Sequence, residues 1–304
     1  MSVALQWFGR ISLCLLVAGF APFGVVRATD DVASPWRFVH NAPETEGDQR
    51  YAYHWRVLRA ALEVTRSKYG DYRLEPGPPM SEKLQVVEMQ RAHGGLSTLV
   101  LDATQTLEQT LLPVKIPVDK GLLGYRVFLI QAEDQPRFAD VRSLEQLRQL
   151  RFGQQREWSD VAVYQAAGLP VVTGSSYEGL FHMLMLRRFD AFGRGVSEVG
   201  GELAHWRKQY PQMAIESELL LYYPLPVYFW FARTDEGRLR AQRVEEGMLA
   251  LIADGTLDRL FTEEYATTIQ QLGLDSRRTL RIANPHLSSN HPFDNAAYWF
   301  TPMP

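Results

Sequence analysis

The sequence has a single cysteine, Cys14, among 304 residues. Because a disulfide needs two cysteines, the chain can form no internal disulfide, and it can form no metal site built from several thiolates. Cys14 itself lies in an apolar run near the N-terminus. The fold must therefore be stabilised by its core. Hydrophobic residues make up 46% of the chain, which suits one large domain or two modest ones.

Positive charge is also sparse. The chain has 32 Lys and Arg residues against 35 Asp and Glu residues, a formal net charge of −3 at pH 7. No basic run is dense enough to follow a phosphate backbone, so nucleic acid is a poor candidate partner. The seven histidines form no HxxxH pair, and we predict neither a metal site nor a cofactor.

A long hydrophobic run occurs only at the N-terminus. Arg10 precedes an apolar stretch over 11–26, and Val26-Arg27-Ala28 has small residues at the positions that a signal peptidase reads. The pattern predicts a cleaved secretory signal over residues 1–28. An uncleaved anchor is the alternative, but it needs about 20 apolar residues, and Pro22 interrupts this shorter run. We therefore predict a periplasmic protein with no stable membrane insertion after cleavage.

The rest of the chain alternates between strand and helix patterns. Strands are predicted at 36–40, 71–74 and 96–101, with helices at 51–69 and 84–91, which gives a first α/β lobe. A second series begins with the apolar strand at 124–130 and has short strands at 151–153, 170–172 and 189–192. Ser143 and Ser175 each begin a helix with a capping box. The aromatic stretch 222–231 is predicted to be a buried strand, and the tail beyond Gly273 to be mostly irregular.

These patterns together resemble one family. Ser143–Leu147 followed by Arg151–Gln155, then Phe189-Asp190-Ala191, then Asp254–Leu260, stand in the order and spacing of the bacterial periplasmic solute-binding proteins of the polar-amino-acid type. The resemblance implies an α/β, two-lobed periplasmic-binding-protein-like fold (type II) with two hinge strands. It implies lobe one at 29–128 and 226–304, and lobe two at 129–225.

The resemblance also implies where a small-molecule ligand is held. Candidates are Thr104 and Thr106 after a lobe-one strand, and Trp158 and Ser159 at the start of a lobe-two helix, where N–H groups favour an anion. Ser159 could instead only cap its helix, with Trp158 packed in the core.

Two departures from the family concern the ligand. The family's Thr-x-x-Arg carboxylate clamp is replaced by Thr106-Leu107-Glu108-Gln109, and the acid expected after Asp190 is replaced by Gly193-Arg194-Gly195. An ordinary α-amino acid is therefore a doubtful ligand.

Two cationic positions complete the predicted site. Arg194 is predicted to follow a strand end and to face an anionic or strongly electron-rich ligand, or else to pair with Glu198 in a structural turn. Either Lys115 or Lys120 is expected near the opening between the lobes, although both could be solvated surface lysines.

The predicted function is capture of a small anionic or polar ligand between the two lobes for transport or sensing, with an inner-membrane transporter or a signalling protein as the partner. Two alternatives stay open. One is a sensor module for a membrane signalling protein. The other is an enzyme on the same fold that uses a cleft carboxylate, Glu157 or Glu198, for elimination or hydrolysis. We predict that the protein is not an enzyme.

Overall fold

The computed structural model of the protein describes residues 36–42, 51–91 and 94–302. The predicted signal segment, residues 1–28, lies outside the described residues. Among the residues that are described, no helix is both long enough and apolar enough to cross a membrane.

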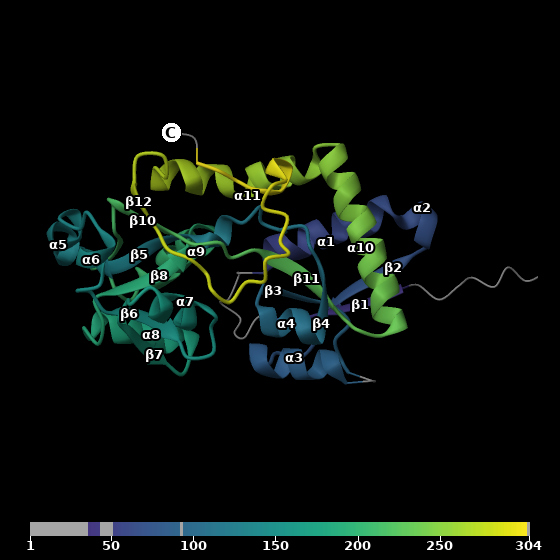
Figure 1. Ribbon diagram of the computed structural model, residues 1–304, viewed down its shortest axis with the longest axis horizontal. Coiled ribbons are helices and arrows are strands. Elements are labelled where there is room, and N and C mark those ends of the chain that lie inside the picture. Colours follow the sequence, from purple (N-terminus) through teal and green to yellow (C-terminus); the bar gives the residue numbers. More distant parts are fainter. Residues whose placement is uncertain (1–35, 43–50, 92–93, 303–304) are drawn as a thin grey trace, which may run out of the picture. The chain divides into compact units, whose positions relative to one another are not determined.

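One group of elements surrounds two small sheets, and we call it the first lobe (Figure 1). Its parallel pair is β1 (Trp36–His40) with β2 (Tyr72–Pro76), and its antiparallel sheet has the order β3 (Leu99–Asp102), β11 (Val227–Ala232), β4 (Leu111–Val114). A bridge between His40 and Thr98 joins β1 to the start of β3. Its helices are α1 (Ala52–Val64), α2 (Arg66–Tyr69), α3 (Glu82–Gln90), α4 (Gln105–Thr110) and α10 (Asp235–Ala253).

A second group surrounds a seven-stranded sheet, and we call it the second lobe. The strand order is β12 (Arg278–Arg281), β10 (Leu219–Tyr222), β5 (Tyr125–Gln131), β8 (Ala191–Gly195), β6 (Phe152–Gln155), β7 (Val171–Gly174), and β9 (Met213–Ile215) also pairs with β5. Strands β8, β6 and β7 are parallel. The helices are α5 (Gln135–Ala139), α6 (Leu144–Leu147), α7 (Asp160–Ala166), α8 (Tyr177–Met185) and α9 (Val196–Trp206).

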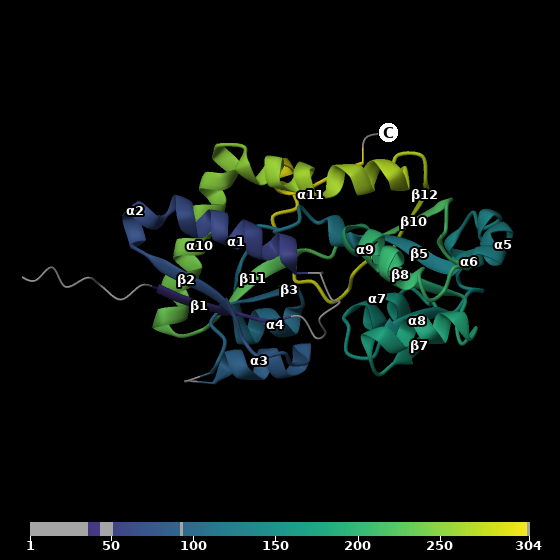
Figure 2. The ribbon, with the colours of Figure 1, turned by 180° about the vertical axis from the view of Figure 1, so that it is seen from behind.

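Helix α11 (Thr256–Leu272) contacts both lobes, as Figures 1 and 2 show from opposite sides. Glu264 on α11 pairs with Arg56 on α1 at 3.1 Å. On the other side α11 packs against α9. One buried apolar cluster correspondingly contains Leu58 and Phe229 of the first lobe together with Phe181 and Val199 of the second. The sheets of the two lobes are separate, but the apolar cores that support them meet.

The predicted two-lobed α/β fold is confirmed. The chain passes between the lobes at β4–β5 and at β10–β11. The lobe boundaries at 128 and 226 stay a prediction. β12, in the predicted irregular tail, pairs in register with β10 of the second lobe.

Two local predictions were wrong. Arg194 does not follow its strand but lies inside β8, opposite Val127 of β5, because the strand continues through both flanking glycines. Helix α8 is capped by Ser176 rather than Ser175, since the Ser176 hydroxyl accepts the Gly179 N–H at 3.2 Å.

Candidate functional site

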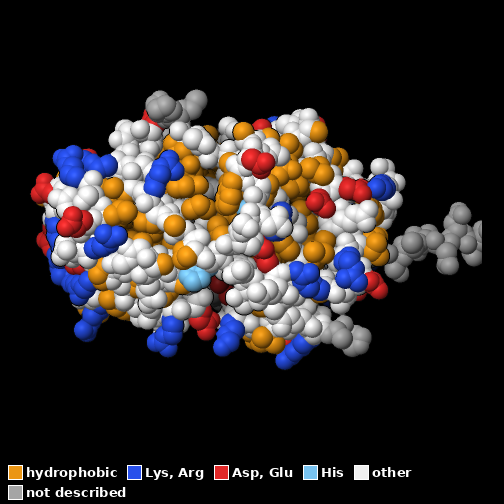
Figure 3. Space-filling view, in the orientation of Figure 1, with side chains coloured by type: hydrophobic (Ala, Val, Ile, Leu, Met, Phe, Trp, Pro, Cys, Tyr) orange, Lys and Arg blue, Asp and Glu red, His pale blue; other side chains and the backbone are white. Residues whose placement is uncertain are grey.

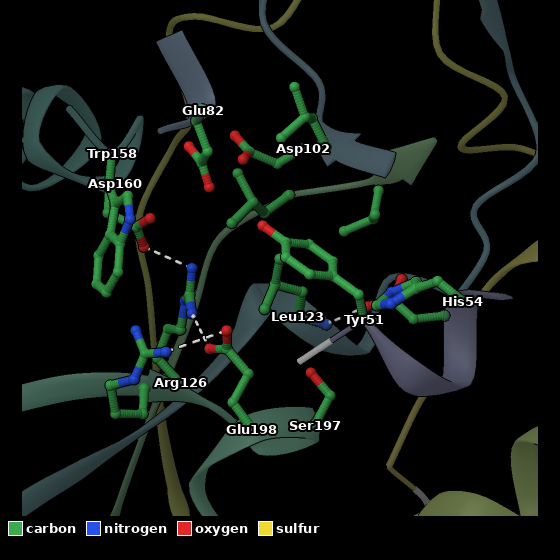
Figure 4. A pocket seen from close by; sticks show the side chains of 15 residues that line it. Tyr51, His54, Glu82, Asp102, Leu123, Arg126, Trp158, Asp160, Ser197 and Glu198 are labelled. Carbon is green, nitrogen blue, oxygen red and sulfur yellow. Dashed lines mark hydrogen bonds and ion pairs between the residues drawn. The ribbon is translucent and has the colours of Figure 1, made fainter. Parts of the chain in front are cut away.

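A cavity lies where strands of both lobes end. β3 of the first lobe ends at Asp102, and β8 of the second ends at Gly195, immediately before α9. In open α/β sheets, ligands bind beyond the carboxyl ends of the strands. The cavity offers about 70 Å³ to the centres of water-sized spheres. Its lining residues include Tyr51, His54, Glu82, Asp102, Asp119, Leu123, Arg126, Trp158, Asp160, Arg194, Ser197 and Glu198 (Figure 4).

This volume is well below the roughly 300–1,000 Å³ typical of pockets for drug-sized ligands. The arrangement described therefore suits a small ligand. Anything larger requires the lobes to move apart.

The floor of the cavity is organised by Arg126 on β5. Its guanidinium bonds Asp160 at 2.5 Å and Tyr223 Oη at 2.9 Å, and it lies 3.4 Å from Glu198. The side chains of Arg126 and Asp160 are 3% and 8% exposed, so this ion pair is almost dry. Tyr223 also donates to Asp160, which joins the β10–β11 connection to the same network.

Arg194 is held by carboxylates and aromatic rings. Its Nε and Nη2 donate to Glu202 at 2.9 and 2.6 Å, and Nη2 lies 3.1 Å from Glu198. The guanidinium carbon lies 4.7 Å from the ring centre of Trp158 and 5.0 Å from that of Phe192, which is cation–π distance. Arg194 is 2% exposed and borders the cavity.

The two glycines beside Arg194 allow close packing. A Cβ on Gly193 would come within 2.2 Å of the Tyr164 hydroxyl, and one on Gly195 within 2.6 Å of Leu123. Neither glycine has a positive φ. The two glycines are therefore required by packing on one face of β8, while Arg194 points to the other face, and the Gly-Arg-Gly sequence is not a turn.

Two carboxyl groups that line the cavity, the buried Asp119 and the half-buried Asp102, have no guanidinium partner in their hydrogen bonds. Asp119 accepts the N–H groups of Gly121 and Leu123 at 3.0 and 2.9 Å, and burial raises its pKa to about 6. Asp102 accepts the Ser159 hydroxyl at 2.5 Å, and burial raises its pKa as well. Both groups would gain from a nearby positive charge, because a cation favours the ionised carboxylate.

The Ser159–Asp102 hydrogen bond also joins the lobes directly. Ser159 precedes α7 of the second lobe, and its side chain makes no capping bond to its own helix. Asp102 ends β3 of the first lobe. The hydroxyl thus contributes to a contact across the cavity instead of to the helix end.

The predicted site residues fall into two groups. Trp158 and Arg194 line the cavity, and Ser159 bonds one of its carboxylates. Thr104 caps α4, accepting the Leu107 N–H at 3.2 Å, and Thr106 is exposed on that helix; neither lines the cavity. Their ligand roles stay predictions.

The two predicted lysines lie elsewhere as well. Lys115 donates to the Asn290 carbonyl at 2.6 Å. Lys120 pairs with Asp258 and borders a different groove, between α11 and residues 299–302, where Figure 3 shows apolar side chains gathered. Neither lysine lines the cavity.

Sequence reasoning missed Arg126, Asp102, Asp119 and Asp160. Arg126 is a single cation inside an otherwise apolar strand pattern, and Asp102 is the first charged residue after the predicted buried strand at 96–101. A charge in such a place must be paired or functional, which was the available signal.

The chain was compared with known proteins. None of the protein-family models matches it, and no curated protein matches it. Solved structures do. One is an amino acid ABC transporter substrate-binding protein from Streptococcus pneumoniae bound to L-arginine, with 16% identity and a TM-score of 0.56 over 77% of this chain and 96% of that one.

Two further structures give the same result. A Salmonella typhimurium periplasmic binding protein with high arginine specificity has 15% identity and a TM-score of 0.55, covering 76% of this chain and 99% of that one. An ancestral arginine-binding protein bound to arginine has 16% identity and a TM-score of 0.54, covering 77% and 99%. At such identities the likeness establishes the fold. This chain has the two-lobed fold of the periplasmic substrate-binding proteins, as its sequence predicts.

Proposed function

We propose that the protein captures a small polar ligand between its two lobes in the periplasm and presents it to an inner-membrane transporter. The observation that carries the proposal is the cavity, because strand ends and helix starts of both lobes supply charged side chains to it. A ligand held by both lobes favours the closed arrangement, which is how binding changes the surface that a partner meets.

The charges of the cavity favour a ligand with a cationic group, such as an ammonium or a guanidinium. Five carboxyl groups and two guanidiniums line the cavity. Both guanidiniums already have carboxylate partners, with Arg126 on Asp160 and Arg194 on Glu202. The predicted anionic ligand on Arg194 would have to compete with Glu202, so we expect the opposite charge.

An enzyme on this fold is less well supported. Glu198 accepts the Gly195 N–H at 3.0 Å and lies 3.4 Å from Arg126 and 3.1 Å from Arg194. Two guanidiniums stabilise the ionised form and weaken a carboxylate as a base. Glu157, the other candidate, is exposed and does not line the cavity.

A thermal-shift screen tests the ligand class. The panel contains lysine, arginine and simple diamines on one side, and dicarboxylates and inorganic phosphate on the other. A ligand at a hundred times its dissociation constant stabilises the folded state by about 2.7 kcal/mol, which is readily measured. We expect shifts with cations alone. A shift produced only by the anions would contradict the cationic assignment and support the role predicted for Arg194.

A sensor role is separated from a transport role by the partner. Purified protein with its ligand is mixed with membranes that contain a candidate permease and ATPase, or a candidate signalling protein. Ligand-dependent uptake indicates transport, whereas ligand-dependent kinase or cyclase activity indicates sensing.

A further inference from the structure

The segment after β12 connects the lobes a fourth time, after β4–β5, β10–β11 and the return through α11 to β12. The chain passes between the lobes at β4–β5 and again at β10–β11, and these are the two expected hinge connections. Beyond β12 it leaves the second lobe once more and runs along the first, as the yellow segment of Figures 1 and 2 shows. We call residues 282–300 the C-terminal strap.

The strap begins firmly on the second lobe. β12 pairs with β10 over four residues, and the Ile282 N–H continues the ladder by donating to the Tyr222 carbonyl at 2.9 Å. The guanidinium of Arg278 donates to the Val141 carbonyl at 2.5 Å. Asn284 then donates to the Pro224 carbonyl at 2.9 Å, beside the β10–β11 connection.

The strap is next bonded to the first lobe. The His286 carbonyl accepts the Gln105 N–H of α4 at 2.8 Å. Ser288 donates to Glu108 at 2.8 Å. His291 lies 2.9 Å from the Tyr228 hydroxyl through Nδ1 and 3.0 Å from Glu108 through Nε2, with its side chain 0% exposed.

The end of the strap returns to the other hinge connection. The Phe300 N–H donates to the Lys120 carbonyl at 2.7 Å, and its own carbonyl accepts the Tyr125 hydroxyl at 3.3 Å. The Trp299 ring packs so closely on Gly121 that a Cβ there would come within 2.6 Å of it.

We propose that the strap tethers the two lobes and limits how far the hinge opens. Four residue steps separate Ile282, bonded to the second lobe, from His286, bonded to the first. A fully extended chain spans about 3.3–3.6 Å per residue, so this part of the strap reaches no more than about 14 Å. Further opening at this side requires the strap to leave one of its anchors. A hinge of two strands alone has no such restriction.

The restriction concerns the ligand-free protein, so its test is independent of the ligand and of the proposed function. When the lobes are held near the closed arrangement, closing on a ligand costs less free energy, because a larger fraction of the molecules is already able to bind it.

The test measures a distance across the cavity. Lys83 and Glu157 are exposed and adjoin the cavity residues Glu82 and Trp158, one in each lobe. The variant Lys83→Cys/Glu157→Cys, in a Cys14→Ser background, carries two spin labels whose separation is read by pulsed electron resonance without ligand. The decisive variant inserts ten Gly and Ser residues between Ala283 and Asn284, which lengthens the strap and leaves every anchor in place.

The matched control inserts the same ten residues between Lys208 and Gln209, both exposed after α9. We expect a longer and broader distance distribution with the lengthened strap and an unchanged one in the control. A second variant places a specific protease site in the strap insertion, so that the strap is cut after folding, and cutting should broaden the distribution further. An unchanged distribution in both the lengthened and the cut protein would overturn the proposal, as would equal broadening by the control.

Discussion

The ion pair of Arg194 with Glu202 is almost fully buried next to the cavity. The two side chains are 2% and 4% exposed. Removing one partner of such a pair leaves the other charge buried, at a cost of about 3–5 kcal/mol, whereas replacing both by apolar residues is often neutral or stabilising. We expect Arg194→Met to lower the free energy of unfolding by that amount, measured by denaturant titration.

The double variant Arg194→Met/Glu202→Leu separates pairing from ligand contact. We expect it to recover most of the lost stability. If the single variant keeps wild-type stability and loses only ligand affinity, Arg194 is a ligand-facing cation, as its sequence context predicts. Arg238→Ala is the control, because that side chain is 58% exposed and its pair with Asp235 is worth under about 1 kcal/mol.

Asp119 should make stability depend on pH. Its folded pKa is raised from 3.8 to about 6, so the folded state holds a proton that the unfolded state has already released. Stability from this group is complete below about pH 3.8 and is lost as pH rises through about 6, a total of about 3 kcal/mol. We expect Asp119→Asn to remove this fall.

The measurement is the difference in unfolding free energy between wild type and Asp119→Asn across pH 4–7. The difference cancels the opposite trend of His40 and His291, whose lowered pKa values cost stability as pH falls. A difference that does not change with pH would mean that Asp119 is ionised throughout. Asp258→Asn, at a side chain 66% exposed, is the control.

At the scale of elements, two helical glycines should respond oppositely to alanine. In α10, a Cβ on Gly247 would come within 2.3 Å of the Ala61 carbonyl of α1, so the two helices would have to separate. In α9, a Cβ on Gly201 would meet nothing within 4 Å. We expect Gly247→Ala to destabilise the protein by about 1–3 kcal/mol and Gly201→Ala to stabilise it by about 0.5–1 kcal/mol.

Thermal unfolding of the two variants checks this pair. Both substitutions raise helix propensity equally, so propensity alone predicts two increases in midpoint temperature. An increase for Gly247→Ala would show that α1 and α10 do not pack as closely as described.

Most elements were predictable because their signals are local. The apolar spacing of 51–69, the strand pattern of 36–40 and the prolines before β11 each report on their own neighbourhood. β12 was not, since Arg-Thr-Leu-Arg becomes a strand only because the edge of β10 is available to it. Register and edge pairing depend on partners far along the chain.

The site was predictable only in part for the same reason. The sequence placed Trp158 and Arg194 at the ligand edge of the fold, and both line the cavity, although Arg194 lies inside β8 and not beyond its end. The pairing of Arg194 with Glu202 could not be read from sequence, because it depends on where one turn of α9 places a second acid beside β8. The sign of the ligand was inferred from Arg194 alone, without the carboxylates that neutralise it.

At the scale of the whole molecule, the lobes meet through groups of unlike chemistry. An apolar cluster continues beneath the cavity, and the Ser159–Asp102 hydrogen bond crosses it. Asp102 thus both bonds the other lobe and lines the cavity. Changes at this carboxyl should therefore affect ligand binding and lobe closure together.

Ligand capture should release protons if the ligand is a cation. The raised pKa of Asp119, about 6, means that this group holds a proton at mildly acidic pH, and burial shifts the pKa of Asp102 in the same direction. A cation beside them lowers both pKa values, so binding expels protons and affinity rises as pH increases through about 6.

Calorimetry near pH 6 in two buffers of different ionisation enthalpy counts the protons that binding releases. We expect release in wild type, less release and weaker binding in Asp102→Asn, and wild-type behaviour in the control Thr267→Ala on the exposed surface of α11. Proton uptake on binding would instead identify an anionic ligand, whose negative charge raises the pKa of the same carboxyls.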